Sequence, residues 1–81
     1  MEIAYVLVKS KIGHEVDVMN EILKIDGVKE VMGTYGVYDI FVKVQATTRN
    51  EVEQIITKKM RKVGNAISTT TLSVIPGQGG K

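Results

Sequence analysis

The sequence carries one pattern of elements twice, and this internal repeat limits the folds open to the chain. Sliding the chain by 36 positions aligns apolar and acidic residues of the first half with similar residues of the second, namely Val6, Val8, Glu15, Val16 and Met19 with Val42, Val44, Glu51, Val52 and Ile55. Each half has a β-branched run, a segment with helical apolar spacing and a second β-branched run, so the predicted order is β-α-β-β-α-β. Two such right-handed units form a four-stranded antiparallel sheet with both helices on one face. The sequence therefore predicts an α+β, ferredoxin-like fold.

Local signals give the expected boundaries of these elements. The predicted strands are residues 3–8, 28–34, 40–44 and 67–75, and the predicted helices follow Gly13 and Thr48. Thr48 and Glu51 have the spacing of a capping box, in which both side chains bind free amides at a helix start. Gly64 is suited to end the second helix. Gly36 lies in the expected turn at 35–38, because glycine readily adopts the positive φ that tight turns require.

The length and charge of the chain exclude several classes of protein. Its 81 residues suit one domain, expected at 1–76, followed by a flexible glycine-rich tail at 77–81. The 11 basic and 9 acidic residues give a net charge of +2, which predicts no direct binding to DNA. Without cysteine there is no disulfide, thiolate zinc site or cysteine nucleophile. No apolar run approaches the ~20 residues of a membrane span, and no basic signal peptide precedes the first strand, so we expect a cytoplasmic protein without membrane contact.

The predicted sheet leaves one apolar face without helices. Because strand side chains alternate, the small branched residues of strands one and three pack under the helices. The opposite face then carries Ile3, Tyr5, Leu7 and Phe41. An exposed apolar patch of this kind is typical of an interface, and a small domain gains stability from further burial. We therefore expect a sheet-to-sheet homodimer of the dimeric α+β barrel type, and a partly hydrated open face is the alternative.

Few residues offer catalytic chemistry. His14, the only histidine, stands beside Glu15 at a helix start, and no serine or cysteine nucleophile is patterned around it. The carboxylates form no metal-ligand spacing with His14, and the glycines form no phosphate-binding loop. The sequence therefore predicts no catalytic residue, no metal site and no cofactor.

Asp39 and a run of hydroxyl residues suggest binding instead. Asp39 begins a strand, where aspartate is disfavoured, and it follows the Gly36 turn directly. Its carboxylate could hold an ammonium group or pin the turn by local hydrogen bonds, and the residues alone favour pinning. Ser68 to Thr71 place hydroxyls on the last strand, although threonine is also a good strand former. Together the turn, the acid and the hydroxyls could bind a small zwitterion.

The stretch from Val28 to Val44 resembles the core signature of the effector-binding domain of the Lrp/AsnC family, the feast/famine regulators, also called the RAM domain. Gly36-Val37-Tyr38-Asp39 matches the family's Gly-x-Tyr-Asp pattern. Gly13-x-Glu15 before the first helix and the threonine-rich stretch from Ile67 to Val74 are also similar to the family. The resemblance covers roughly residues 2–75, and the order and spacing of its motifs make it specific.

This resemblance implies a binding module for a free amino acid in the regulation of amino-acid metabolism or transcription. It implies that Tyr35, Gly36, Tyr38 and Asp39 line the site, with Thr69, Thr70 and Thr71 as further candidates. It also implies homodimers that assemble into rings, often octamers. Family regulators carry a helix-turn-helix domain before this module, whereas the first strand here begins near residue 2. We therefore expect a stand-alone RAM module without its own DNA-binding domain, with a full-length Lrp/AsnC regulator as a candidate partner.

Two alternatives from other classes remain at this level. The RNA recognition motif has the same element order and places base-stacking aromatics on strands one and three, where Tyr5 and Phe41 stand. Its third-strand signature, however, begins with a basic residue and carries two further aromatics, and Asp39 occupies the basic position. The other alternative is a small dimeric α+β barrel enzyme that uses His14.

Overall fold

The computed structural model describes residues 1–75 and 77–80, and it has the predicted order of elements. Strand β1 (Glu2–Ser10) leads through helix α1 (Glu15–Leu23) to the hairpin of β2 (Val28–Gly33) and β3 (Ile40–Ala46). Helix α2 (Arg49–Gln54) continues into the turns η1 (Ile55–Lys59) and η2 (Met60–Lys62), and β4 (Ala66–Ser73) follows. Every predicted element is present, and the strand ends differ from the predicted ones by at most two residues.

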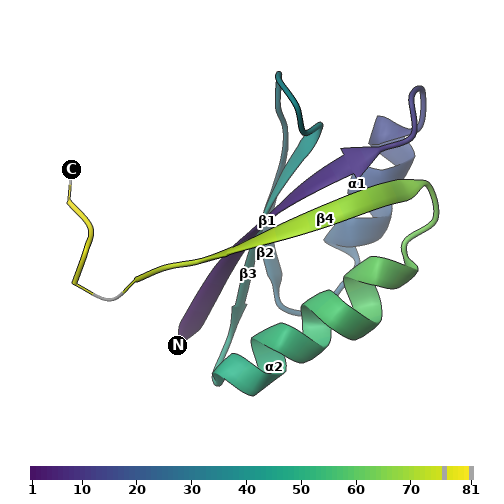
Figure 1. The fold of residues 1–81 in the computed structure, drawn as a ribbon. Coiled ribbons are helices and arrows are strands. Elements are labelled where there is room, and N and C mark those ends of the chain that lie inside the picture. The colour runs from purple at the N-terminus through teal and green to yellow at the C-terminus, as the bar shows by residue number, and fades with distance from the viewer. Residues whose placement is uncertain (76, 81) are drawn as a thin grey trace.

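The four strands form one antiparallel sheet in the order β2-β3-β1-β4. Both helices lie on the same side of this sheet, and the β2–β3 hairpin projects beyond it at one end (Figure 1). The central strands β1 and β3 pair from Glu2 with Ala46 to Val8 with Ile40. This arrangement confirms the predicted ferredoxin-like fold.

The core lies between the sheet and the two helices. The alternating residues of the central strands are at most 3 % exposed, as predicted, and comprise Ala4, Val6, Val8, Ile40, Val42 and Val44. From the helices they meet Val18, Ile22, Val52, Ile55, Ile56, Met60 and Val63. Full burial of one such aliphatic side chain contributes about 1.5–3 kcal/mol relative to its exposure, so this layer supplies most of the stabilisation.

The second helical segment is one continuous run whose geometry changes along its length. It begins as an α-helix, widens to a π-helix over η1 and tightens to a 3₁₀ turn over η2. Its apolar residues, which have helical spacing in the sequence, are all buried, namely Val52, Ile55, Ile56, Met60 and Val63. The predicted stop is displaced by one residue, because Asn65 rather than Gly64 adopts the left-handed backbone, with φ of 67°. Asparagine is among the few other residues that tolerate this region, and the Asn65 carbonyl accepts a hydrogen bond from Lys11 N–H at 2.8 Å.

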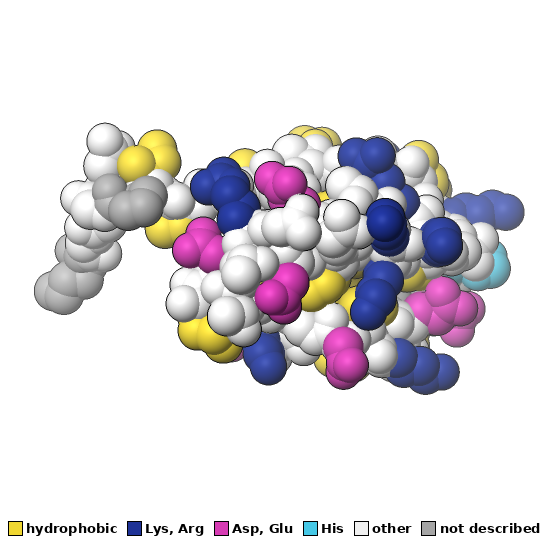
Figure 2. Space-filling model, turned by 90° about the horizontal axis from the view of Figure 1, so that it is seen from below, with side chains coloured by type: hydrophobic (Ala, Val, Ile, Leu, Met, Phe, Trp, Pro, Cys, Tyr) yellow, Lys and Arg dark blue, Asp and Glu magenta, His cyan; other side chains and the backbone are white. Residues whose placement is uncertain are grey.

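After β4 the chain leaves the body of the domain (Figures 1 and 2). Val74 and Ile75 are more than half exposed. The predicted domain boundary at residue 76 and the last residue of the predicted tail, Lys81, lie outside the described residues. Within the described part of the chain, no helix has the length and apolar character needed to cross a membrane.

Candidate functional site

The turn between β2 and β3 is closed by hydrogen bonds at its base. Thr34 N–H donates to the Asp39 carbonyl at 2.8 Å, and the Thr34 hydroxyl donates to the Tyr38 carbonyl at 2.8 Å. Gly36 at the tip has φ of 118°, a conformation that residues with a Cβ rarely adopt. The predicted role of Gly36 as a turn residue is confirmed.

Asp39 pins this turn to the end of β1. Its N–H donates to the Val8 carbonyl at 3.0 Å, and its Oδ2 accepts from Ser10 N–H at 2.8 Å. Ser10 is only 3 % exposed, so the carboxylate provides the acceptor that its amide needs. Of the two roles considered for Asp39, pinning the turn is the one whose hydrogen bonds are present in the structure.

A cavity of about 440 Å³ lies where this turn meets α1. Tyr35 and Asp39 line it, together with Thr34 and Gly33 from the hairpin and with Glu15 and Met19 from α1. Gly36 and Tyr38, which were also expected in the site, are not among the lining residues. The contribution of α1 was not predicted, because α1 and the turn meet only in the folded chain. The Gly13-x-Glu15 motif was the one signal in the sequence that could have indicated it.

The three candidate threonines do not lie on one side of the sheet. Thr70 pairs with Leu7 and faces the open side, and its Oγ1 lies 2.7 Å from the Tyr38 hydroxyl. Thr69 and Thr71 pair with Val8 and Val6, so they face the helices. Tyr38 and Thr70 therefore form a hydroxyl pair on the open face, separate from the cavity at the turn.

The open face carries the apolar residues that the sequence predicted there. The rings of Tyr5 and Phe41 stack with centroids 5.3 Å apart at 28°, and Ile3 and Leu7 are half-buried like them. Met32 and Leu72 extend this patch, because they pair with Phe41 and Tyr5, and they are 50 % and 48 % exposed. The sequence did not single them out, since their face depends on the register of the two edge strands.

His14 lies at the N-cap of α1, at the predicted helix start. Its Nδ1 is 3.6 Å from Asp17 Oδ2, and its side chain is 40 % exposed. In the described residues, no three side chains of the histidine, cysteine, aspartate or glutamate types come together as metal ligands. His14 thus belongs to a helix-start pair rather than to the cavity at the turn.

Comparison with known proteins identifies what this chain is similar to. The sequence model of a family described as the Lrp/AsnC ligand binding domain matches residues 3–76. The crystal structure of FFRP-DM1 superposes with a TM-score of 0.86 at 37 % identity, covering 93 % of this chain and 100 % of that one. The regulator NMB0573 from Neisseria meningitidis, solved as a complex with L-Met, has a TM-score of 0.82 over 98 % of this chain and 53 % of its own. Its identity is 12 %, so that likeness concerns the fold alone.

An enzyme also shares part of this sequence. A homocitrate synthase of Saccharolobus islandicus is 51 % identical over 51 residues, which are 63 % of this chain. The match spans 11 % of the enzyme's length. This likeness therefore concerns one small part of that relative.

Proposed function

Because this chain belongs to the Lrp/AsnC ligand-binding domain family, we propose that it is an effector-binding regulatory module for a free amino acid. The observation that carries the proposal is the cavity between α1 and the β2–β3 turn, beside the Gly-x-Tyr-Asp motif. The complex of the similarly folded NMB0573 with L-Met supports this class of ligand. In this proposal the module acts in the cytoplasm, performs no catalysis and does not bind DNA itself.

The turn offers complementary groups for a zwitterion. Gly36 leaves its backbone open, since nothing lies within 4 Å of the position that a Cβ would occupy. Its neighbouring amides would meet the ligand carboxylate, and Tyr35 would cover the side chain. The Asp39 carboxylate, besides its bond to Ser10, would accept the ammonium. Tyr38, Thr70 and the helix-facing Thr69 and Thr71 remain weaker candidates.

The proposed assembly has two contacts. The open face of Ile3, Tyr5, Leu7 and Phe41 forms a homodimer, and the hairpin tips join dimers into a ring, with an octamer as the expected form. Tyr35 is fully exposed and Val37 is 75 % exposed at that tip, which supports a second contact there. The site is then completed between dimers, so ligand binding and ring formation strengthen each other.

The output of the module depends on its partner. A full-length Lrp/AsnC regulator is the first candidate, since the module would join its ring. The likeness to homocitrate synthase favours a biosynthetic enzyme as a second candidate, because an equivalent segment forms part of that enzyme. Co-sedimentation of the module with each purified candidate, with and without the amino acid, shows which of the two proteins it binds.

A thermal-shift screen of the twenty amino acids tests the proposed ligand class. A ligand at 100 times its dissociation constant adds about 2.7 kcal/mol, which raises the melting temperature measurably. We expect Tyr35→Ala to weaken the response and Leu23→Ala, an exposed change on α1 outside the cavity and the hairpin tip, to leave it unchanged. If none of the twenty raises the melting temperature of the wild type, the amino-acid proposal is wrong.

A further inference from the structure

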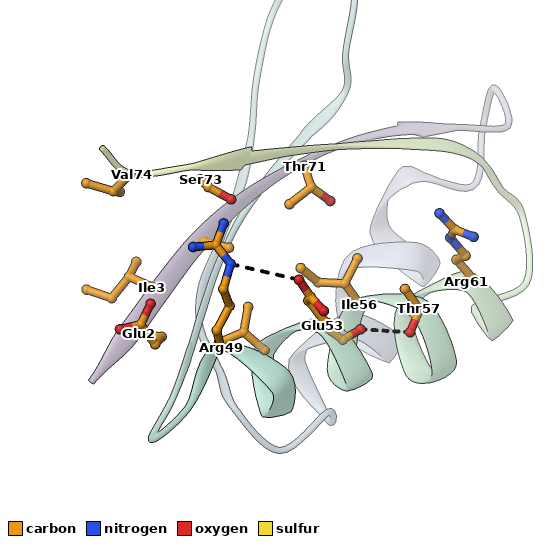
Figure 3. A pocket seen from close by; sticks show the side chains of 12 residues that line it. Glu2, Ile3, Arg49, Glu53, Ile56, Thr57, Arg61, Thr71, Ser73 and Val74 are labelled. Carbon is orange, nitrogen blue, oxygen red and sulfur yellow. Dashed lines mark hydrogen bonds and ion pairs between the residues drawn. The ribbon is translucent and has the colours of Figure 1, made fainter. Parts of the chain in front are cut away.

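A second cavity lies on the helix side of the sheet, away from the open face and the turn. It has a volume of about 310 Å³ and lies between β4, the start of β1 and the α2–η2 run (Figure 3). Ligand pockets span about 300–1,000 Å³, so this groove suits a molecule with few heavy atoms. Its apolar floor consists of Ala4, Val52 and Ile56, which also belong to the core.

The groove is open because β4 presents hydroxyls where the central strands present aliphatic side chains. Val6 and Val8 are fully buried, whereas Thr71 and Ser73 on the same side of β4 are exposed. Two short polar side chains do not fill the space up to the helix, and the core ends at β1. In the described part of the chain, neither hydroxyl has a hydrogen-bond partner.

The charged groups of the groove are unevenly placed, with Glu2, Arg49 and Glu53 toward one end and Arg61 at the other (Figure 3). Arg49 pairs with Glu53 through Nε at 3.9 Å, and Figure 3 shows its guanidinium rising from α2 toward Ser73. Arg61 stands at the other end of the groove and forms no ion pair with any described residue. The Thr57 hydroxyl is occupied, since it donates to the Glu53 carbonyl at 2.7 Å.

We propose that this groove binds a small aliphatic monocarboxylate. The Arg61 guanidinium and the Thr71 hydroxyl hold the carboxylate, because charged donors favour an anionic acceptor. The aliphatic part lies over Val52 and Ile56, which are only 4 % and 5 % exposed, so the gain comes from removing the ligand's own apolar surface from water. The two carboxylates of the groove leave this end free for an anion, because Glu53 is paired with Arg49 and Glu2 lies at the end opposite Arg61 (Figure 3). This site is independent of the amino-acid site at the turn.

Three probes of one shape test the charge preference. They are 4-methylpentanoate, its neutral amide and 3-methylbutylamine, each titrated to about 20 mM, which detects millimolar affinity. The measurement is the shift of the Val52 and Ile56 methyl signals in ¹H–¹³C spectra of the whole chain. We expect the carboxylate to shift these signals saturably, with at least fivefold weaker binding of the amide and the amine.

Variants of the polar groups locate the carboxylate. Arg61→Gln should weaken the carboxylate at least fivefold and leave the amide unchanged, and Thr71→Val should weaken it about twofold to fivefold, since one donor is lost. Lys58→Gln is the matched control, because it removes one charge from the same helical run outside the groove. If Lys58→Gln and Arg61→Gln weakened carboxylate binding equally, the effect would come from the overall charge of the helical run, and the proposal would be overturned.

Two further outcomes also overturn it. In one, the groove methyls do not respond to 4-methylpentanoate, or the amine binds best. In the other, nuclear Overhauser contacts between Ile56 and Ile75, two residues after β4, appear in the free protein, which would mean that the chain itself fills the groove. The turn signals of Tyr35 serve as an internal reference, since a response there alone would assign the probe to the amino-acid site.

Discussion

Asp39 shows how one side chain can serve both the fold and the proposed site. Its carboxylate joins the β2–β3 turn to the buried amide of Ser10, and the same residue borders the cavity at the turn. A change at Asp39 therefore alters stability as well as any contact with a ligand. An affinity measured on an Asp39 variant must be interpreted together with its stability.

We expect Asp39→Ala to lower the free energy of unfolding by about 1–3 kcal/mol, because the Ser10 amide loses its acceptor while it remains buried. Asp39→Asn is the matched control, since its amide oxygen can still accept this bond and the loss should be smaller. Urea denaturation of the three proteins measures the difference. Equal stability of wild type and Asp39→Ala would mean that the Ser10 bond contributes nothing.

Gly36 allows the cost of an unfavourable backbone conformation to be measured without any steric clash. Its φ of 118° is unfavourable for residues with a Cβ, yet no atom lies within 4 Å of the position that a Cβ would take. We expect Gly36→Ala to destabilise the chain by about 1–3 kcal/mol through backbone strain alone. Gly64→Ala, also in open space but without the positive φ, should change stability by less than about 0.5 kcal/mol. Thermal unfolding of both variants gives the comparison.

At the scale of elements, the start of α2 confirms the capping signal in part. The Thr48 hydroxyl accepts from Glu51 N–H at 3.2 Å, as a helix cap requires. In a full capping box the Glu51 carboxylate would accept from the backbone amide of Thr48. Here it accepts instead from the Thr48 hydroxyl at 3.3 Å. This cap holds the first turn below the groove that Arg49 and Glu53 line.

We expect Thr48→Ala to cost about 1 kcal/mol, because the Glu51 amide loses its acceptor at the helix start. Thr48→Ser keeps the hydroxyl and should remain within a few tenths of a kcal/mol of the wild type. Chemical denaturation measures both values, and amide exchange at Glu51 localises the effect. A loss of the same size in Thr48→Ser would attribute it to the methyl group instead.

The sequence predicts elements well where a pattern is local and less well where register decides. The alternation through Val6 and Val42 was enough to separate the two faces of the sheet. The same alternation places Thr70 and Thr71 on opposite faces of the sheet, and this could have been inferred from the sequence when the two were grouped in one site. By contrast, the bond between Asp39 and Ser10 joins residues 29 positions apart, and it depends on the pairing of β1 with β3. The groove beside β4 depends on how the helical run packs, which no local pattern encodes.

At the scale of the whole molecule, the domain combines a closed core on one side of its sheet with an apolar patch on the other. The Tyr5–Phe41 stack lies in the middle of this patch, and Met32 and Leu72 flank it on the edge strands. The helix side instead mixes acidic and basic side chains (Figure 2). This asymmetry is the reason that we expect self-association through the open face.

We expect the wild type to remain dimeric or larger on dilution to micromolar concentration, and Phe41→Lys to dissociate it, because the change buries an unpaired charge in the contact. Val16→Lys is the control, since Val16 is 68 % exposed on α1, away from the open face. Light scattering gives the masses, and circular dichroism verifies that both variants are folded. A monomeric wild type, or equal dissociation by both variants, would contradict the predicted interface.

The three tyrosines have three different surroundings, and the chain has no tryptophan to mask their emission. Tyr5 stacks on Phe41 in the open face, Tyr35 stands fully exposed at the hairpin tip, and Tyr38 shares a hydrogen bond with Thr70. Phenol fluorescence depends on hydration and on hydrogen bonding of the hydroxyl, so each residue responds to its own surroundings. Replacing two tyrosines at a time by phenylalanine leaves one intrinsic reporter for each of these surroundings, without an added dye.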